Sequence, residues 1–204
     1  MSQLLVPGVP QLPNPAQQYD VGLADQHNRA LGRYFSSLTS TLQQVLLGFN
    51  HYGTFYDTNT KTNAVANTAN LVTFNTTGEA FGIALAATTS RVTVSRDGVY
   101  RISYVAQLDK TGAGVGTAYF WGRLNGTDIT ASASKVAVNG ATDEKTVTKM
   151  FVLEMHGGDY FEVVWSADDT GVTLPAATAA SPVPAIPSVR LSIVFAYPGD
   201  VSRT

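Results

Sequence analysis

Turn signals recur at short intervals between residues 53 and 198, and they limit what this part of the chain can fold into. Five of them are built from the residues that tight turns require, namely Arg96-Asp97-Gly98, Asn125-Gly126, Asn139-Gly140, Gly157-Gly158-Asp159 and Asp169-Thr170-Gly171. The segments between the turns are the length of strands, and they show no alternation of strands with helices. This pattern predicts an antiparallel sandwich or jelly roll.

The apolar segments between these turns predict about eight strands. Alternate side chains are apolar from Tyr100 to Leu108 and again from Val189 to Tyr197, so each of these two strands presents one face to a core. The predicted strands are Phe55–Asp57, Leu71–Phe74, Arg91–Ser95, Val99–Leu108, Ala118–Leu124, Thr146–Met155, Tyr160–Ser166 and Val189–Tyr197.

Two of these strands are apolar on both faces, which is unusual for an antiparallel sandwich with one wet side. They are Ala118–Leu124 and Tyr160–Ser166. The outer face of such a strand needs a cover. We therefore predict that a second copy of the chain covers it, with Tyr119 and Trp121 in the interface of a trimer.

Residues 16–48 predict one helix ahead of the sandwich. Leu31, Leu38 and Val45 are seven residues apart and form a heptad-like seam. The helix is rich in Ser and Thr and too short to be stable alone, so it needs partner helices or a surface to lie on. We expect a trimeric coiled coil or a surface-docking helix; packing on its own domain is the alternative.

Residues 1–15 predict an extended arm, because the four prolines in this segment fix φ and disfavour helix. The segment has no charge, unlike a solvated linker, and we expect it to anchor the protein on a partner. A frayed terminus is the alternative. Residues 199–204 form a tail. The predicted anchoring residues are Leu4, Leu5, Val6, Val9 and Leu12.

The charge content excludes one class of function. Charged residues make up 14% of the chain, against about 25% in an ordinary soluble domain, and the net charge is -2. With no basic cluster, the chain is not expected to bind nucleic acid. It has no cysteine, no apolar run near the roughly 18 residues that cross a membrane, and an N-terminus unlike a signal peptide. We expect no membrane partner and synthesis in the cytoplasm.

The aspartates near residue 169 are the strongest candidates for chemistry. Asp169-Thr170-Gly171 matches the catalytic triplet of aspartic proteases. These enzymes need two such carboxylates at one site. Because the triplet follows Asp168 after a predicted strand, a turn is the preferred interpretation. A calcium site on Asp168 and Asp169 stays open, although the loop does not match an EF-hand.

No other segment carries a catalytic or cofactor pattern. The glycine-rich segment Gly112–Gly116 precedes a strand where a phosphate-binding loop would precede a helix. His27, His51 and His156 lack metal-ligand spacing, and His156 fits a turn. We therefore predict a non-enzymatic protein with no catalytic, cofactor-binding or metal-binding residue.

The sequence of the predicted head resembles a known family. The segment Asp97–Tyr104 resembles the strand that opens the globular head of the complement recognition molecule and its tumour-necrosis-factor relatives. Phe120–Gly126, Phe151–Val163 and Phe195–Pro198 resemble later hairpins and the closing strand of that head, in the same order. The resemblance covers residues 53–198. It implies a ten-strand jelly roll that works as a homotrimer.

This chain departs from the complement heads in having no cysteine and no collagen stalk. A helix stands in place of the stalk, a combination similar to that of phage virion appendages. The resemblance thus implies a virion structural protein, a capsid decoration or cement protein or a head- or tail-fibre knob, bound to phage capsid or tail proteins. The alternative is a carbohydrate-binding host-attachment module that recognises a surface glycan.

The uncharged segment Gly171–Ser188 is predicted to be an ordered, extended loop. Its four prolines cannot donate to a ladder. Without charge, it is expected to lie against an apolar surface or a neighbouring subunit.

Overall fold

In a computed structural model, the described residues are 21–48, 51–140 and 143–198, with the side chains of residues 43–48 excepted. The chain divides into two compact units, Met1–Phe49 and Asn50–Thr204. The predicted arm, its five anchoring residues and the tail 199–204 lie outside the described residues. The described helix is not both long and apolar enough to cross a membrane.

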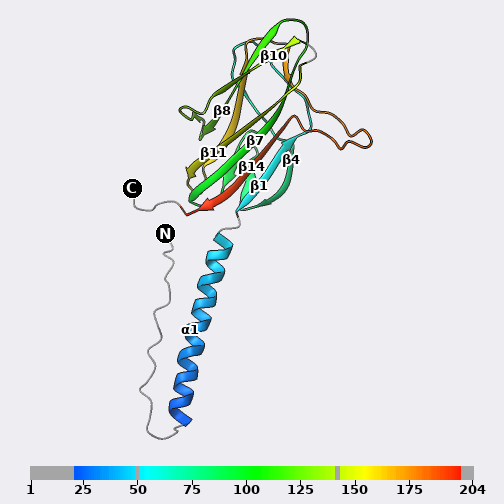
Figure 1. Cartoon of the computed structure of the whole chain (residues 1–204). Helices are drawn as coiled ribbons and strands as arrows, with labels where there is room; N and C mark the ends of the chain where they lie inside the picture. The colour runs from blue at the N-terminus through cyan, green and yellow to red at the C-terminus, as the bar shows by residue number, and fades with distance from the viewer. Residues whose placement is uncertain (1–20, 49–50, 141–142, 199–204) are drawn as a thin grey trace. The chain divides into compact units, whose positions relative to one another are not determined.

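The first unit contains the predicted helix, α1, at Val21–Gly48 (Figure 1). Leu31 and Leu38 of the predicted seam are half-buried, and the third seam residue, Val45, has a side chain outside the described part. None of residues 21–42 is buried, and Phe35 and Leu42 are 57% and 53% exposed. Among the described residues of this unit, none covers the apolar surface that the helix presents between residues 21 and 42.

The second unit is an all-β sandwich. Its first seven-stranded sheet has the order β2-β13-β7-β14-β1-β4, with β11 also paired to β7 (Figure 1). All the pairs between these strands are antiparallel. The strands are β1 (Tyr52–Asp57), β2 (Lys61–Thr62), β4 (Thr76–Phe81), β7 (Gly98–Lys110), β11 (Lys145–Met155), β13 (Val172–Leu174) and β14 (Val189–Tyr197).

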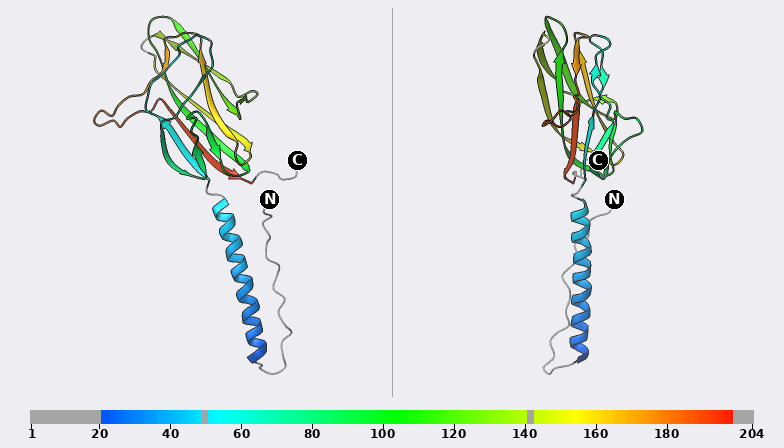
Figure 2. Two further views of the ribbon diagram at one scale, coloured as in Figure 1. Left: turned by 180° about the vertical axis from the view of Figure 1, so that it is seen from behind. Right: turned by 90° about the vertical axis from the view of Figure 1, so that its right-hand side faces the viewer.

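The second sheet, which also has seven strands, has the order β10-β8-β12-β6-β5, with β3 paired to β12 and β9 to β8. Its strands are β3 (Asn70–Leu71), β5 (Ile83–Leu85), β6 (Val92–Val94), β8 (Val115–Leu124), β9 (Thr127–Asp128), β10 (Ser134–Asn139) and β12 (Tyr160–Ala167). Figure 2 shows the two layers edge-on. This architecture confirms the predicted sandwich with one helix.

The described residues contain fourteen strands where about eight were predicted. All eight predicted segments overlap a strand, although Leu71–Phe74 shares only Leu71 with β3 and Arg91–Ser95 is shortened to β6. Three of the six additional strands, β2, β4 and β9, have no buried position and therefore no alternation to detect; β4, for example, is exposed at five of its six positions. The additional strands are β2, β4, β5, β9, β10 and β13.

The prediction for Gly171–Ser188 was wrong in part. Val172–Leu174 forms β13, which pairs with both β7 and β2. Only the remainder, which holds the prolines, is a loop, and it folds back through the bridges Ala177–Ile186 and Ala180–Val183. Val183 and Ile186 are 52% and 40% exposed, so this loop does not lie against an apolar surface of its own chain.

The core lies between the two sheets and is built from the alternating positions that the sequence indicates. Tyr100, Ile102, Tyr104 and Leu108 of β7 are at most 1% exposed. Rings from both sheets meet there: the ring centroids of Tyr104 and Phe120 are 6.4 Å apart, and those of Phe120 and Trp165 are also 6.4 Å apart. Burial of these rings provides the main driving force for folding.

Two core tyrosines differ in one respect that mutation can test. The Tyr100 hydroxyl donates to the Arg96 carbonyl oxygen at 2.7 Å, and burial raises the pKa of Tyr100 to about 12. The buried Tyr104 hydroxyl has no hydrogen-bond partner among the described residues, and burial raises the pKa of that side chain further.

We expect Tyr104→Phe to raise the free energy of unfolding by about 1 kcal/mol, because it removes an unpaired buried polar group. Tyr100→Phe is the matched control and should lower it by about 1 kcal/mol through loss of a hydrogen bond. Urea unfolding of both variants at one protein concentration measures the two changes. Destabilisation of similar size by both would contradict the assignment of the Tyr104 hydroxyl as unpaired.

Candidate functional site

The outer face of the first sheet carries the most exposed large apolar side chains of the head. Met150 and Val152 of β11 are each 65% exposed. Val194 of β14, Tyr52 of β1 and Phe81 of β4 are 37%, 40% and 50% exposed. We name this surface, formed by Tyr52, Phe81, Arg101, Met150, Val152 and Val194, the β11 face.

Strand register places these residues in a row across the sheet. Val152 pairs with Arg101, and Arg101 pairs with Val194 on its other side. Tyr52 pairs with Phe81 at the other edge of the sheet. Residues paired across strands share a face, so the apolar side chains form one surface. Arg101 is compatible with such a surface, because arginine is enriched in protein interfaces.

The outer face of the second sheet carries the predicted interface residues Tyr119 and Trp121, both on β8. Tyr119 is 39% exposed and Trp121 is half-buried. The register places Ser166 and Lys135 on either side of Tyr119, and Val164 beside Trp121. The structure thus brings the two predicted aromatic residues together on one exposed surface. We name the surface formed by Leu71, Tyr119, Trp121, Arg123, Asp128 and Lys135 the β8 face.

Trp121 is held in place by a carboxylate. Its indole Nε1 donates to Asp128 Oδ1 at 2.7 Å, and Arg123 Nε donates to the same oxygen. These hydrogen bonds, first from Arg123 and then from Trp121, lower the pKa of Asp128. Asp128 is therefore ionised near neutral pH. Sequence reasoning missed it because Asp128 follows the Asn125-Gly126 turn, where an aspartate is ordinary.

The second strand predicted to need a partner's cover, β12, is covered by its own chain. Val164 and Glu162 point to the outer side and are 0% and 2% exposed. Glu162 accepts hydrogen bonds from Ser90 Oγ and Arg91 Nε, and Arg91 lies over the Tyr160 ring. The apolar outer face of β12 therefore gives no reason to expect a second copy there.

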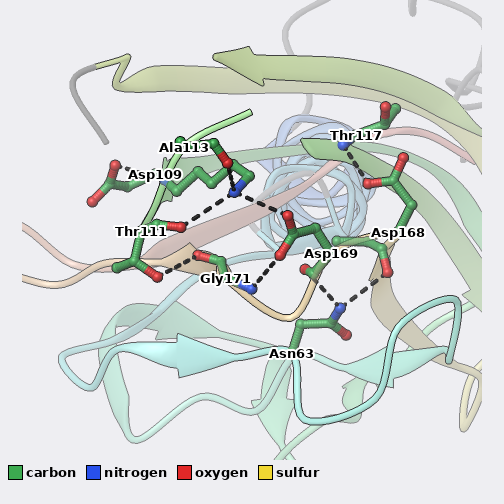
Figure 3. A network of polar contacts seen from close by, with 10 residues as sticks. Asn63, Asp109, Thr111, Ala113, Thr117, Asp168, Asp169 and Gly171 are labelled. Atoms are coloured by element: carbon green, nitrogen blue, oxygen red, sulfur yellow. Dashed lines mark hydrogen bonds and ion pairs between the residues drawn. The ribbon is translucent and has the colours of Figure 1, made fainter. Parts of the chain in front are cut away.

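The aspartates of the triplet segment belong to a network of polar contacts at the β12–β13 turn (Figure 3). The Lys110 side chain is 2% exposed, and its Nζ lies 2.9 Å from Asp169 Oδ2. It also donates to the carbonyl oxygens of Thr111 and Ala113, both at 3.2 Å. The side-chain hydrogen bond from Lys110 is the main cause of the lowered pKa of Asp169. Lys110 thus ties the β7–β8 connection to the β12–β13 turn.

The same network accounts for the other residues of the triplet. Asp168 Oδ1 accepts from the Thr117 backbone N–H at 2.6 Å, and Asp169 Oδ1 accepts from the Gly171 N–H at 2.7 Å. A Cβ on Gly171 would lie 2.6 Å from the Thr111 carbonyl oxygen, so the close approach of the two loops requires glycine. The residues Asp168–Gly171 form a structural turn, as predicted, and the turn links the two sheets.

The calcium alternative gains no support from this arrangement. The ammonium of Lys110 lies where a cation beside Asp169 would bind. In the described part of the chain, no three His, Cys, Asp or Glu residues are grouped to hold a metal ion. His156 lies in the turn between β11 and β12, with Nδ1 3.6 Å from Asp159 Oδ2. The segment Gly112–Gly116 leads from β7 into β8, as a loop and the first residues of that strand.

Comparisons with known proteins show similarity to solved structures. No protein-family model and no curated protein matches the chain. Among solved structures, the chain is similar to the globular domain of zebrafish complement 1qA protein, at 14% sequence identity and a TM-score of 0.46, over 74% of this chain and 100% of that one.

Proposed function

We propose that this chain is a non-enzymatic structural protein of a bacteriophage virion, a capsid decoration or cement protein or a fibre knob. In this proposal it acts as a homotrimer. Residues 1–15 and α1 bind phage capsid or tail proteins, and the jelly-roll head lies at the surface. The observation that carries the proposal is the β11 face, an apolar surface on an intact sheet that no described residue of the chain covers.

The exposed fractions on the β11 face favour self-association through this sheet. Met150 and Val152 leave 65% of their surface in water, whereas Tyr119 leaves 39% and Trp121 already has a partner for its N–H. Contiguous exposed apolar side chains mark interaction sites on soluble proteins. The helix supports the same proposal, since Leu31 and Leu38 are half-exposed at heptad spacing.

The virion part of the proposal is supported by composition and by the family resemblance of the sequence. The chain has 14% charged residues, and residues 1–15 are uncharged. The prolines restrict the backbone of the arm, and this reduces the conformational entropy that the arm would lose on binding. A host-attachment module is the second candidate, and the aromatic residues of the β8 face favour it.

Deletion of residues 1–15 is expected to abolish incorporation into the virion while leaving the head folded and trimeric. All the described core residues belong to the second unit, so the head is expected to keep its fold without the arm. Light scattering should give a mass near three times that of one chain for both forms of the protein, the full-length chain being 21.6 kDa. To measure incorporation, a phage that lacks its own copy of the protein would be grown in cells that supply either form. The protein content of the purified particles would then be compared. Normal incorporation of the truncated chain would contradict the anchoring role, and a monomeric full-length chain would contradict the trimer.

A further inference from the structure

We infer that the β8 face is a binding site for an uncharged oligosaccharide, formed by an aromatic platform of Tyr119 and Trp121 beside the Asp128 carboxylate. The inference rests on the second candidate function, the host-attachment module, and names its binding site. It also requires that the β8 face stays free when the heads assemble through the β11 face.

The platform follows from strand geometry. Tyr119 and Trp121 are two residues apart on β8, and the residue between them, Phe120, is 0% exposed in the core. Both side chains therefore lie on the same side of the sheet, with Cα atoms roughly 6.5 Å apart along the strand. That distance is of the order of one sugar ring, so consecutive rings of an oligosaccharide can cover both side chains.

The polar groups beside the platform match the hydroxyl groups of a sugar. Asp128 is 57% exposed, and Oδ1 accepts both of the hydrogen bonds from Trp121 and Arg123. The second carboxylate oxygen, Oδ2, receives no hydrogen bond among the described residues and faces water as an acceptor. Lys135, the register partner of Tyr119, supplies an exposed donor at the opposite end of the platform.

The site is built before any ligand binds. The hydrogen bond to Asp128 holds the edge of the Trp121 indole, and the buried Val164 supports the strand beside it. Fixing an aromatic side chain in advance lowers the entropy that binding costs. An aromatic surface with few, placed polar groups suits a ligand that has an apolar face and hydroxyl edges, which is the chemistry of a pyranose.

A protein partner fits this surface less well than a sugar does. A dry protein interface would bury the Asp128 carboxylate with one oxygen unpaired, and burial of an incompletely paired charge is costly. A sugar hydroxyl can donate to that oxygen while water still reaches the site. The β11 face has the opposite character, because its side chains are apolar apart from Arg101 and the hydroxyl of Tyr52.

Intrinsic fluorescence of the full-length protein tests the inference directly. The chain has two tryptophans, and Trp165 is 1% exposed, so a change on adding sugar reports Trp121. We would titrate the protein with cellotetraose, chitotetraose, maltotetraose and a galactose tetramer at millimolar concentrations. At least one is expected to shift the emission with saturation and to protect Trp121 from acrylamide quenching. No saturable change with any of the four would overturn the inference.

Variants then connect the binding signal to the platform. Tyr119→Ala and Asp128→Asn should each weaken the binding by about tenfold, and both keep the trimer. Tyr197→Ala is the matched control, because Tyr197 is a 54% exposed aromatic residue of the first sheet, and its binding should be unchanged. Equal affinity of Tyr119→Ala and the unmodified protein would overturn the platform.

The mass of the same samples separates this inference from the proposed function. Sugar binding by a protein that proves monomeric would leave the inference standing and contradict the proposed trimer. Dissociation of the trimer by Tyr119→Ala would show that the β8 face is the subunit interface, and it would contradict the inference.

Discussion

Val152→Asp is expected to convert the trimer into folded monomers. Val152 is 65% exposed in the single chain, so an aspartate there is tolerated in the monomer. In the proposed trimer the valine is buried against a neighbouring copy, and each copy would lose about 1.5–3 kcal/mol of apolar burial. The introduced carboxylate would also have to be buried, which costs more than the lost contact. Light scattering at micromolar concentration measures the mass, and circular dichroism confirms that the β-sheet signal is kept.

Tyr119→Asp is the matched variant, because it places the same charge on the outer face of the other sheet. It should leave the trimer intact if the β11 face is the interface. Dissociation by Tyr119→Asp or Trp121→Asp, with Val152→Asp remaining trimeric, would show that the interface predicted from the sequence is the right one. Dissociation by variants on both faces would show that both sheets contact neighbouring copies.

Trp165→Ala is expected to lower the free energy of unfolding of the head by about 4 kcal/mol. Trp165 is among the largest fully buried side chains, stacks with Phe120 at 6.4 Å between ring centroids, and lies on β12 between β8 and β3. Its removal leaves a cavity that the two sheets cannot close without moving strands. A total stability of about 5–15 kcal/mol is ordinary for a domain, so this change alone would remove much of it.

Urea unfolding at one fixed protein concentration measures the loss, since trimer formation makes the apparent stability depend on concentration. Val65→Ala is the control, because Val65 is 61% exposed and its truncation should change stability by less than about 0.5 kcal/mol. A loss from Trp165→Ala no larger than that of the control would contradict the placement of Trp165 at the centre of the core.

The sequence by itself determined the fold class, the helix and the main core. Its information is local: the alternation from Tyr100 to Leu108 requires one buried face, and Asn125-Gly126 requires a tight turn, in which both residues have positive φ. The edge strand β4 escaped prediction, because an edge strand with little buried surface has no alternation to detect. For β13, the prolines that follow it masked three residues that do pair.

Only the tertiary structure decided which apolar faces are covered and which are open. Ala118–Leu124 and Tyr160–Ser166 look alike in sequence, and β8 and β12 each lie between two other strands. The outer face of β12 is nevertheless buried by its own chain, while β8 leaves Tyr119 exposed. The sequence did not predict that Met150 and Val152 are exposed, because an apolar residue alone does not indicate which side of a strand faces water. The position of the Lys110 ammonium beside Asp169 is likewise a property of two loops distant in the sequence. Exposure depends on long-range packing, and local patterns do not encode it.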